Sequence, residues 1–355
     1  MDKKLEALLT RMKDNRASDL HLTAGSPPHY RIDSELEPAD NDVLGAEDVR
    51  KLIYSLITEQ QRLRFEKELE LDLAFSIDNV ARFRANIFMQ MGKPGCAIRI
   101  IPYEILSISD CGLPEDVVKS FCGAQKGLVL VTGATGSGKS TTLAAMVDEV
   151  NSRRRSHIIT VEDPVEFVHR NKKALIDQRQ ISSDTRSFHS ALKYALRQDP
   201  DVILIGELRD LESISQALII ADTSHLVLAT LHTSDSVQAI NRLVDVFPSH
   251  QQAQIRSQLS FVLLGIISQQ LIPKKDASGR VLAAEVLVNT PAIRNLIRDS
   301  KEHQIYSVIQ TSQEQGMCTM NQALADLYAG GVISYEEAVA RSGNMEELIN
   351  LIGGI

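Results

Sequence analysis

The stretch Gly133-Ala134-Thr135-Gly136-Ser137-Gly138-Lys139-Ser140 matches the pattern G-x-x-x-x-G-K-S/T at every fixed position. The apolar run 127–132 before it is typical of a buried strand, and residues 141–147 after it are typical of the first turns of a helix. A strand, a glycine loop and a helix N-terminus together form a nest of backbone N–H groups that can hold the β-phosphate of a nucleotide. In this pattern Lys139 reaches the β- and γ-phosphate oxygens, and the Ser140 hydroxyl binds Mg²⁺. The sequence therefore predicts a site for a nucleoside triphosphate and Mg²⁺, formed by Gly133, Ala134, Thr135, Gly136, Ser137, Gly138, Lys139, Ser140 and Thr141.

Length and composition narrow the class of protein. The 355 residues exceed one ordinary core and favour two domains, and the net charge of −8 argues against a nucleic-acid partner. No apolar run reaches the length of about 18 residues that a membrane span requires, and the charged N-terminus lacks the apolar centre of a signal peptide. We therefore expect a cytoplasmic protein. Its four cysteines have neither metal-ligand nor redox spacing, so they are expected to be reduced and unpaired.

Residues 1–101 are predicted to form a small α+β domain with an antiparallel sheet. The apolar residues of 3–14 share one helical face, and a helical stretch is expected from about residue 46 to 69. Residues 102–114 contain prolines and serines and show no period, so they are predicted to be a connector. Strands are expected at 30–33, 71–77, 81–88 and 97–101.

Residues 115–290 are predicted to form a doubly wound α/β domain. Compact apolar runs, suited to strands covered on both faces, alternate there with helices expected near 139–151, 185–197 and 210–222. Residues 291–355 are predicted to be almost wholly helical.

Three further segments place polar side chains at the ends of apolar strands. Glu207 follows the apolar strand 202–205, in the position that holds Mg²⁺ through water in nucleotide-binding sheets of this kind. Glu162 and Glu166 lie at the end of another strand, where either carboxylate can activate a water molecule for attack on the γ-phosphate. The segment 224–233 carries His225 and His232 at the two ends of a strand.

These segments, in order with the glycine loop, resemble the secretion ATPases of type II and type IV systems, whose signatures are Walker A, an acidic "Asp box", Walker B and a "His box". The match runs through residues 133–233, and the segment 292–298, AIRNLIR, is similar to that of pilus retraction ATPases of the PilT type. One departure is Ser224, where the family pattern leads us to expect glycine. Ile293, Leu296 and Ile297 form an apolar stripe on the helix predicted there. The helix is expected either to couple the ATPase to the pilus retraction machinery or only to pack on its own domain through this stripe.

The resemblance implies a RecA-like P-loop ATPase core, a smaller PAS-like N-terminal α+β domain and a helical C-terminal region. It implies that Glu162 or Glu166 activates water, that Glu207 serves Mg²⁺, and that His232 either senses the γ-phosphate or organises that corner of the site. His225 could equally be a structural residue. Arginines of the N-terminal domain reach the nucleotide in this family, and Arg82, Arg84 and Arg99 lie on strand-like segments that could present them.

The resemblance also implies a homohexameric motor at the cytoplasmic face of the inner membrane that retracts type IV pili. Its expected partners are a PilC-like platform protein of the inner membrane and other pilus ATPases. Three alternatives remain open at this point: a pilus assembly or type II secretion motor, a PilU-like accessory paralogue, and a nucleic-acid translocase with a RecA-like core. The acidic net charge disfavours the last of these.

Overall fold

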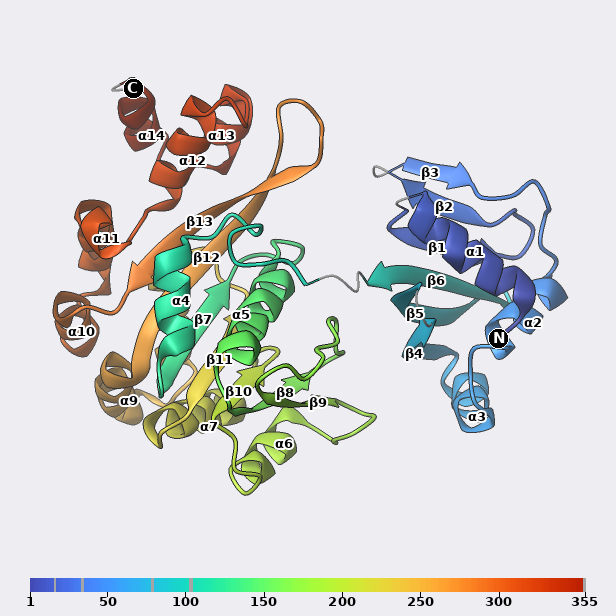
Figure 1. The fold of residues 1–355 in the computed structure, drawn as a ribbon, viewed down its shortest axis with the longest axis horizontal. Coiled ribbons are helices and arrows are strands. Elements are labelled where there is room, and N and C mark those ends of the chain that lie inside the picture. The colour runs from blue at the N-terminus through green and yellow to red at the C-terminus, as the bar shows by residue number, and fades with distance from the viewer. Residues whose placement is uncertain (16, 33–34, 78–79, 102–104, 354–355) are drawn as a thin grey trace. The chain divides into compact units, whose positions relative to one another are not determined.

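The computed structural model describes residues 1–15, 17–32, 35–77, 80–101 and 105–353, which divide into two compact units, Met1–Glu104 and Ile105–Ile355 (Figure 1). Of the predicted connector 102–114, residues 102–104 lie outside the described part. Ile108 and Leu113 are buried in the core of the second unit. The sequence did not indicate this burial, because the apolar residues of the connector follow no helical or strand period. The described part of the connector therefore packs as a piece of the second unit.

The first unit is built on a six-stranded antiparallel sheet in the order β3-β2-β1-β6-β5-β4. The opening helix α1 is capped by Asp2, whose side chain accepts from the Lys4 backbone N–H, and it buries its apolar face. The expected helical stretch 46–69 is two helices rather than one, because Thr58 starts a second helix through reciprocal bonds with Gln61. The elements are α1 (Lys3–Asp14), β1 (Asp19–Thr23), β2 (His29–Ile32), β3 (Glu35–Pro38), α2 (Ala46–Tyr54), α3 (Glu59–Glu68), β4 (Glu70–Ile77), β5 (Ala81–Gln90) and β6 (Lys93–Ile101).

The second unit contains a seven-stranded sheet in the order β13-β12-β7-β11-β10-β8-β9, with β13 antiparallel to β12 and every other neighbouring pair parallel. The α/β fold expected from the sequence is confirmed, and the expected helices correspond to α5, α6 and α7. The elements are α4 (Glu115–Gly123), β7 (Gly127–Thr132), α5 (Lys139–Arg153), β8 (His157–Glu162), β9 (Leu175–Gln180), α6 (Phe188–Ala195), β10 (Val202–Ile205), α7 (Leu211–Asp222), β11 (Leu226–Leu231), α8 (Ser236–Asp245), α9 (Ser249–Val262), β12 (Leu263–Pro273) and β13 (Arg280–Val288).

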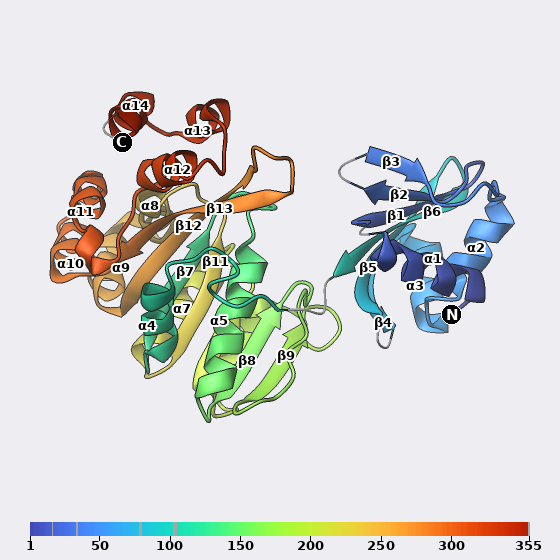
Figure 2. The same cartoon turned by 45° about the horizontal axis from the view of Figure 1, so that its top comes forward.

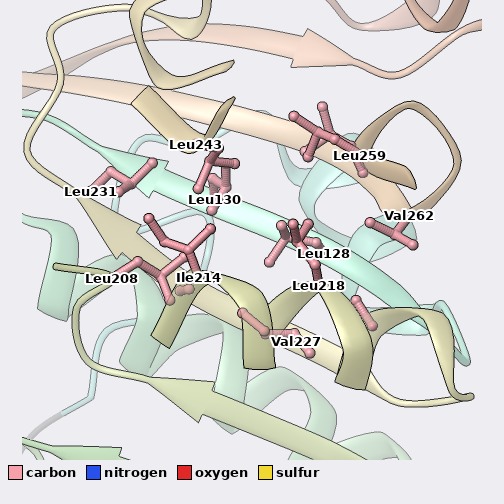
Figure 3. Close-up of a cluster of buried hydrophobic side chains, with 14 of the residues drawn as sticks. Leu128, Leu130, Leu208, Ile214, Leu218, Val227, Leu231, Leu243, Leu259 and Val262 are labelled. Carbon is pink, nitrogen blue, oxygen red and sulfur yellow. The ribbon is translucent and has the colours of Figure 1, made fainter. Parts of the chain in front are cut away.

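The central strands of this sheet are buried on both faces. Leu128 and Leu130 of β7 point into a cluster with α7, α8 and α9 (Figure 3). Val129 and Val131, which alternate with them, belong to the opposite cluster with α4 and α5. This two-sided burial holds the strand ends, and therefore the loops that follow them, in fixed positions.

The residues after Pro291 are mostly helical, as expected, and they belong to the second unit. Helices α12, α13 and α14 gather beside the β12–β13 hairpin, whose Ile272 and Ala283 share their core (Figure 2). No helix in the described ranges is long and apolar enough to cross a bilayer. The C-terminal elements are α10 (Pro291–Arg298), η1 (Glu302–Gln304), α11 (Ile305–Thr311), η2 (Gln313–Gln315), α12 (Met320–Ala329), α13 (Tyr335–Arg341) and α14 (Met345–Gly353).

Helix α10 contains the segment 292–298. Its Ile293 and Ile297 are fully buried in the core cluster of α7, α8 and α9, and Leu296 packs against the same cluster while partly exposed. Arg294 is exposed. The apolar stripe of α10 therefore holds the helix to its own unit, and its exposed face, which includes Arg294 and Arg298, remains available to a partner.

Candidate functional site

The carboxyl ends of four parallel strands meet at one edge of the second sheet. Thr132 at the end of β7 is the register partner of Leu231 in β11, and Ile205 at the end of β10 is the partner of Val161 in β8. The four loops that leave these strands carry the glycine-rich stretch, the acidic segment, Glu207 and His232. Ligands of open α/β sheets bind at such an edge.

The glycine-rich loop depends on backbone conformations that favour glycine. Gly133, Gly136 and Gly138 have φ values of 141°, 80° and 92°. A Cβ on Gly133 would lie 2.5 Å from both the Gln269 carbonyl oxygen and Ser137 Oγ, so the loop and β12 could not pack as they do. Gly138 is the N-cap of α5, and the free N–H groups of that first turn suit an anion.

The side chains of this loop contribute a cation and a hydroxyl group to the candidate phosphate-binding site. Lys139 is buried, and its Nζ donates to the carbonyl oxygens of Gly133 at 2.7 Å and Ala134 at 2.9 Å. Burial lowers the pKa of Lys139, while the carboxylates of Glu207 and Glu166 raise it. Ser137 Oγ is buried without a hydrogen-bond partner among the described residues. A cation, an unpartnered hydroxyl and a helix N-terminus fit the phosphate chain of a nucleotide.

Beside these groups, Ala134, Thr135 and Gly136 are exposed, and Ser140 and Thr141 are partly exposed at the start of α5. Ser140 would supply the hydroxyl oxygen for Mg²⁺ and Glu207 a carboxylate. These donors fit the ion, because Mg²⁺ is usually bound by one or two protein groups together with phosphate oxygens and water.

The two glutamates of the acidic segment have different surroundings. The Glu162 carboxylate accepts from Thr160 Oγ1 at 2.6 Å and from Gln178 Nε2 at 3.3 Å, and burial raises its pKa. Glu166 lies four residues further along, partly exposed, and its charge acts on Lys139. Glu162 is therefore held by side chains of β8 and β9, whereas the charge of Glu166 acts on the buried lysine of the phosphate loop.

Glu207 lies between a cation and a histidine. Its carboxylate is 2.7 Å from Arg209 Nε and 3.4 Å from His232 Nε2. The strand ends are tied together here, because Thr230 Oγ1 donates to the Gly206 carbonyl at 2.5 Å. Arg209, which stands two residues after Glu207, was not among the site residues predicted from the sequence. The sequence signal that could have indicated Arg209 is a basic residue two positions after a carboxylate at a strand end.

His225 lies at the amino end of β11, at the opposite edge of the sheet from His232. Its Nδ1 is 3.3 Å from the Ile220 carbonyl oxygen at the end of α7. Of the two alternatives that the sequence left equal, the structure supports the structural one. Ser224 before it has a φ of 82°, the left-handed conformation for which glycine was expected.

The three candidate arginines belong to the first unit. Arg82 and Arg84 lie two residues apart on β5, and Arg84 is the register partner of Arg99 on β6, so all three share one face of the sheet. Arg99 Nε is 2.9 Å from Asp19 Oδ1, and Arg84 Nε is 3.9 Å from Asp72 Oδ1. Their part in nucleotide binding stays a prediction.

Comparison with known proteins agrees with this geometry. The chain is 50% identical to the type IV pilus retraction ATPase PilT of Pseudomonas aeruginosa over 322 residues, which cover 91% of this chain and 93% of that protein. It is 43% identical to a twitching motility protein of Neisseria gonorrhoeae, over 94% of this chain and 90% of that protein. Among solved structures, the pilus retraction motor PilT with bound ADP superposes with a TM-score of 0.92 at 46% identity, over 99% of this chain and all of that one.

The family model described as type II/IV secretion system protein matches residues 1–340, so both units are included in the match. The phosphate loop, the acidic segment and the strand-end carboxylate that define the site all lie within these residues. The chain therefore belongs to the family of type II/IV secretion system proteins.

Proposed function

We propose that this protein is a motor ATPase that hydrolyses ATP to ADP and phosphate and thereby powers retraction of type IV pili. The observation that carries the proposal is the 50% identity to a pilus retraction ATPase over 91% of the chain, with both units included. The solved retraction motor with bound ADP supports the nucleotide assignment through its TM-score of 0.92.

In the proposed reaction the phosphate loop and Lys139 hold the triphosphate, and charge on the transferred group is offset by groups that are already in place. Glu166 accepts a proton from the attacking water. At the same time the water oxygen bonds to the γ-phosphorus, and the bond between that phosphorus and the ADP oxygen breaks. Ser140 and Glu207 would hold a Mg²⁺ ion, which would supply Lewis-acid stabilisation of the phosphate oxygens. His232, beside Glu207, holds that carboxylate in place.

Glu166 is preferred over Glu162 as the base because of their surroundings. Glu162 already accepts two side-chain hydrogen bonds on the side of β9, whereas Glu166 acts on the buried Lys139. Arg82, Arg84 and Arg99 remain proposed donors of positive charge to the nucleotide. If they serve in this way, nucleotide binding favours closure of one rigid unit on another.

The proposal extends to assembly and location. We expect a ring of six copies at the cytoplasmic face of the inner membrane, in contact with a PilC-like platform protein and working beside other pilus ATPases, with no nucleic-acid partner. Mass measurement with nucleotide and Mg²⁺ tests the ring. A protein that is only monomeric or dimeric at micromolar concentration contradicts it.

The function is tested by deleting the gene, counting surface pili and measuring twitching. Hyperpiliated, immobile cells support the retraction motor. Cells without pili indicate an assembly motor, and loss of protein secretion with normal pili indicates a type II secretion motor. A purified protein whose ATP turnover rises sharply with single-stranded DNA would indicate a translocase.

A further inference from the structure

The edge strand β9 holds the acidic segment through side chains. Residues 163–171, which carry Glu166, have no regular secondary structure, so their backbone groups need partners from elsewhere. Gln178 Oε1 accepts from the His169 backbone N–H at 2.8 Å, and Gln178 Nε2 donates to the Phe167 carbonyl at 2.8 Å. One amide therefore grips the segment on both sides of residue 168.

The same amide also reaches the first glutamate of the segment. Gln178 Nε2 donates to Glu162 Oε1 at 3.3 Å, and the same carboxylate oxygen accepts from Thr160 Oγ1 at 2.6 Å. The Gln178 amide nitrogen thus donates to one carbonyl and one carboxylate, and the Gln178 amide oxygen accepts from a backbone N–H. The opposite amide orientation would set like groups against each other at all three contacts, so the orientation is determined.

The position of the clamp relative to the phosphate loop gives it a consequence for chemistry. Glu162 ends β8, Glu166 follows within the clamped segment, and the Glu166 charge acts on Lys139. The backbone contacts at Phe167 and His169 begin one residue after Glu166. Gln180, also on β9, accepts from the Val165 backbone N–H at 3.3 Å on the other side of Glu166. Because the segment lacks a ladder of its own, side chains of β9 hold the backbone on both sides of Glu166, and Gln178 provides the contacts on the C-terminal side.

We propose that Gln178 is a positioning residue for ATP hydrolysis, which fixes Glu166 relative to Lys139 by clamping the segment 162–169 to β9. This inference rests on the proposed ATPase function. The hydrogen bonds of Gln178 among the described residues go to Glu162, Phe167 and His169, and none goes to the phosphate loop. Its loss is therefore expected to slow the chemical step while leaving nucleotide binding in place.

The test compares Gln178→Glu and Gln178→Met with the wild-type full chain. The first keeps the length and the acceptor but removes both donors, and the second removes all three contacts without adding charge. Each is expected to lower kcat by about 10- to 100-fold, because small misplacements of a reacting group have effects of this size. KM and the affinity for a fluorescent ADP analogue are expected to change by less than about threefold, the pattern of a lost interaction that serves only the transition state.

Asp177→Asn is the matched control. Asp177 is the neighbouring residue on β9, points to the other face of the strand and contacts His157 at 2.9 Å. It also changes the local charge by one unit, but in the opposite direction to Gln178→Glu, and it is expected to keep the wild-type kcat. If Gln178→Glu fails to fold, Gln178→Met still decides the question.

Two results overturn the inference. One is a folded Gln178 variant with kcat within about twofold of the wild type, and the other is a fall in kcat matched by an equal loss of ADP affinity, which indicates general damage to the unit. Absence of ATP turnover in the wild-type protein would instead overturn the proposed function.

Discussion

Replacing Ile297 with alanine is expected to destabilise the second unit. Ile297 is fully buried in the cluster that joins α10 to α7, α8 and α9, and its neighbour Ile293 is buried in the same way. The side chain cannot be shortened there without leaving a cavity. A loss of function in this variant would then reflect lost packing of the segment 292–298, and it would not test whether the segment couples the protein to a partner.

The magnitude follows from the burial. Isoleucine-to-alanine changes at fully buried sites cost about 2–5 kcal/mol, because the lost transfer free energy and the cavity add. In a unit of this size each kcal/mol lowers the melting temperature by about 2–4 °C, so the expected drop is about 4–20 °C. Leu296 is partly exposed, so Leu296→Ala is expected to cost less than Ile297→Ala.

The assay is a thermal scan of the full chain followed by ATP turnover at a temperature at which the variant is folded. We expect Ile297→Ala to melt early but to keep most of its turnover when folded. Arg294→Glu, on the exposed side of α10, is the matched control and should melt like the wild type. A melting temperature of Ile297→Ala within about 2 °C of the wild type would refute the reasoning. If Arg294→Glu keeps its turnover but abolishes retraction in cells, α10 couples the motor to its machinery, and intact twitching would remove that role.

Three further predictions concern other sites. Lys139→Ala should lower ATP turnover by about 100-fold or more in a folded protein, since it removes the cation placed for the phosphates, and near-normal turnover would disprove that assignment. Ser224→Gly should raise stability by about 1 kcal/mol in a denaturant titration, because glycine adopts the φ of 82° without strain; Ser224→Ala should bring no such gain, and equal gains from both would contradict the explanation. Burial lowers the pKa of His169 from 6.5 to about 4, so between these pH values the unfolded chain binds a proton that the folded chain does not. The free energy of unfolding should therefore fall as the pH drops through this window, by up to about 1.4 kcal/mol per pH unit. His169→Gln should flatten that slope in urea titrations at several pH values, and an unchanged slope would show that other groups cause it.

Much of the fold could be predicted because its signals are local. The alternation of Leu128 and Val129 along β7, the glycines of the phosphate loop and the apolar face of α1 each follow from the geometry of one strand, turn or helix. The strands β1, β3 and β9 and the hairpin β12–β13 were not predicted. Short strands and strands of mixed polarity such as β9 have no clear period, and they form because partners distant in the sequence supply their ladders.

The sequence by itself determined the chemistry of the site: a glycine-rich loop before a helix, a lysine and hydroxyl for phosphate and Mg²⁺, and carboxylates at strand ends. Only the tertiary structure decided what surrounds each of these groups. It set Glu162 against Gln178, gave the Glu166 charge an effect on Lys139, and placed His225 at the amino ends of the strands, away from the site. The physical reason is that residue types and short spacings encode local conformation, whereas the direction a carboxylate faces depends on strands and loops that meet only when the chain folds.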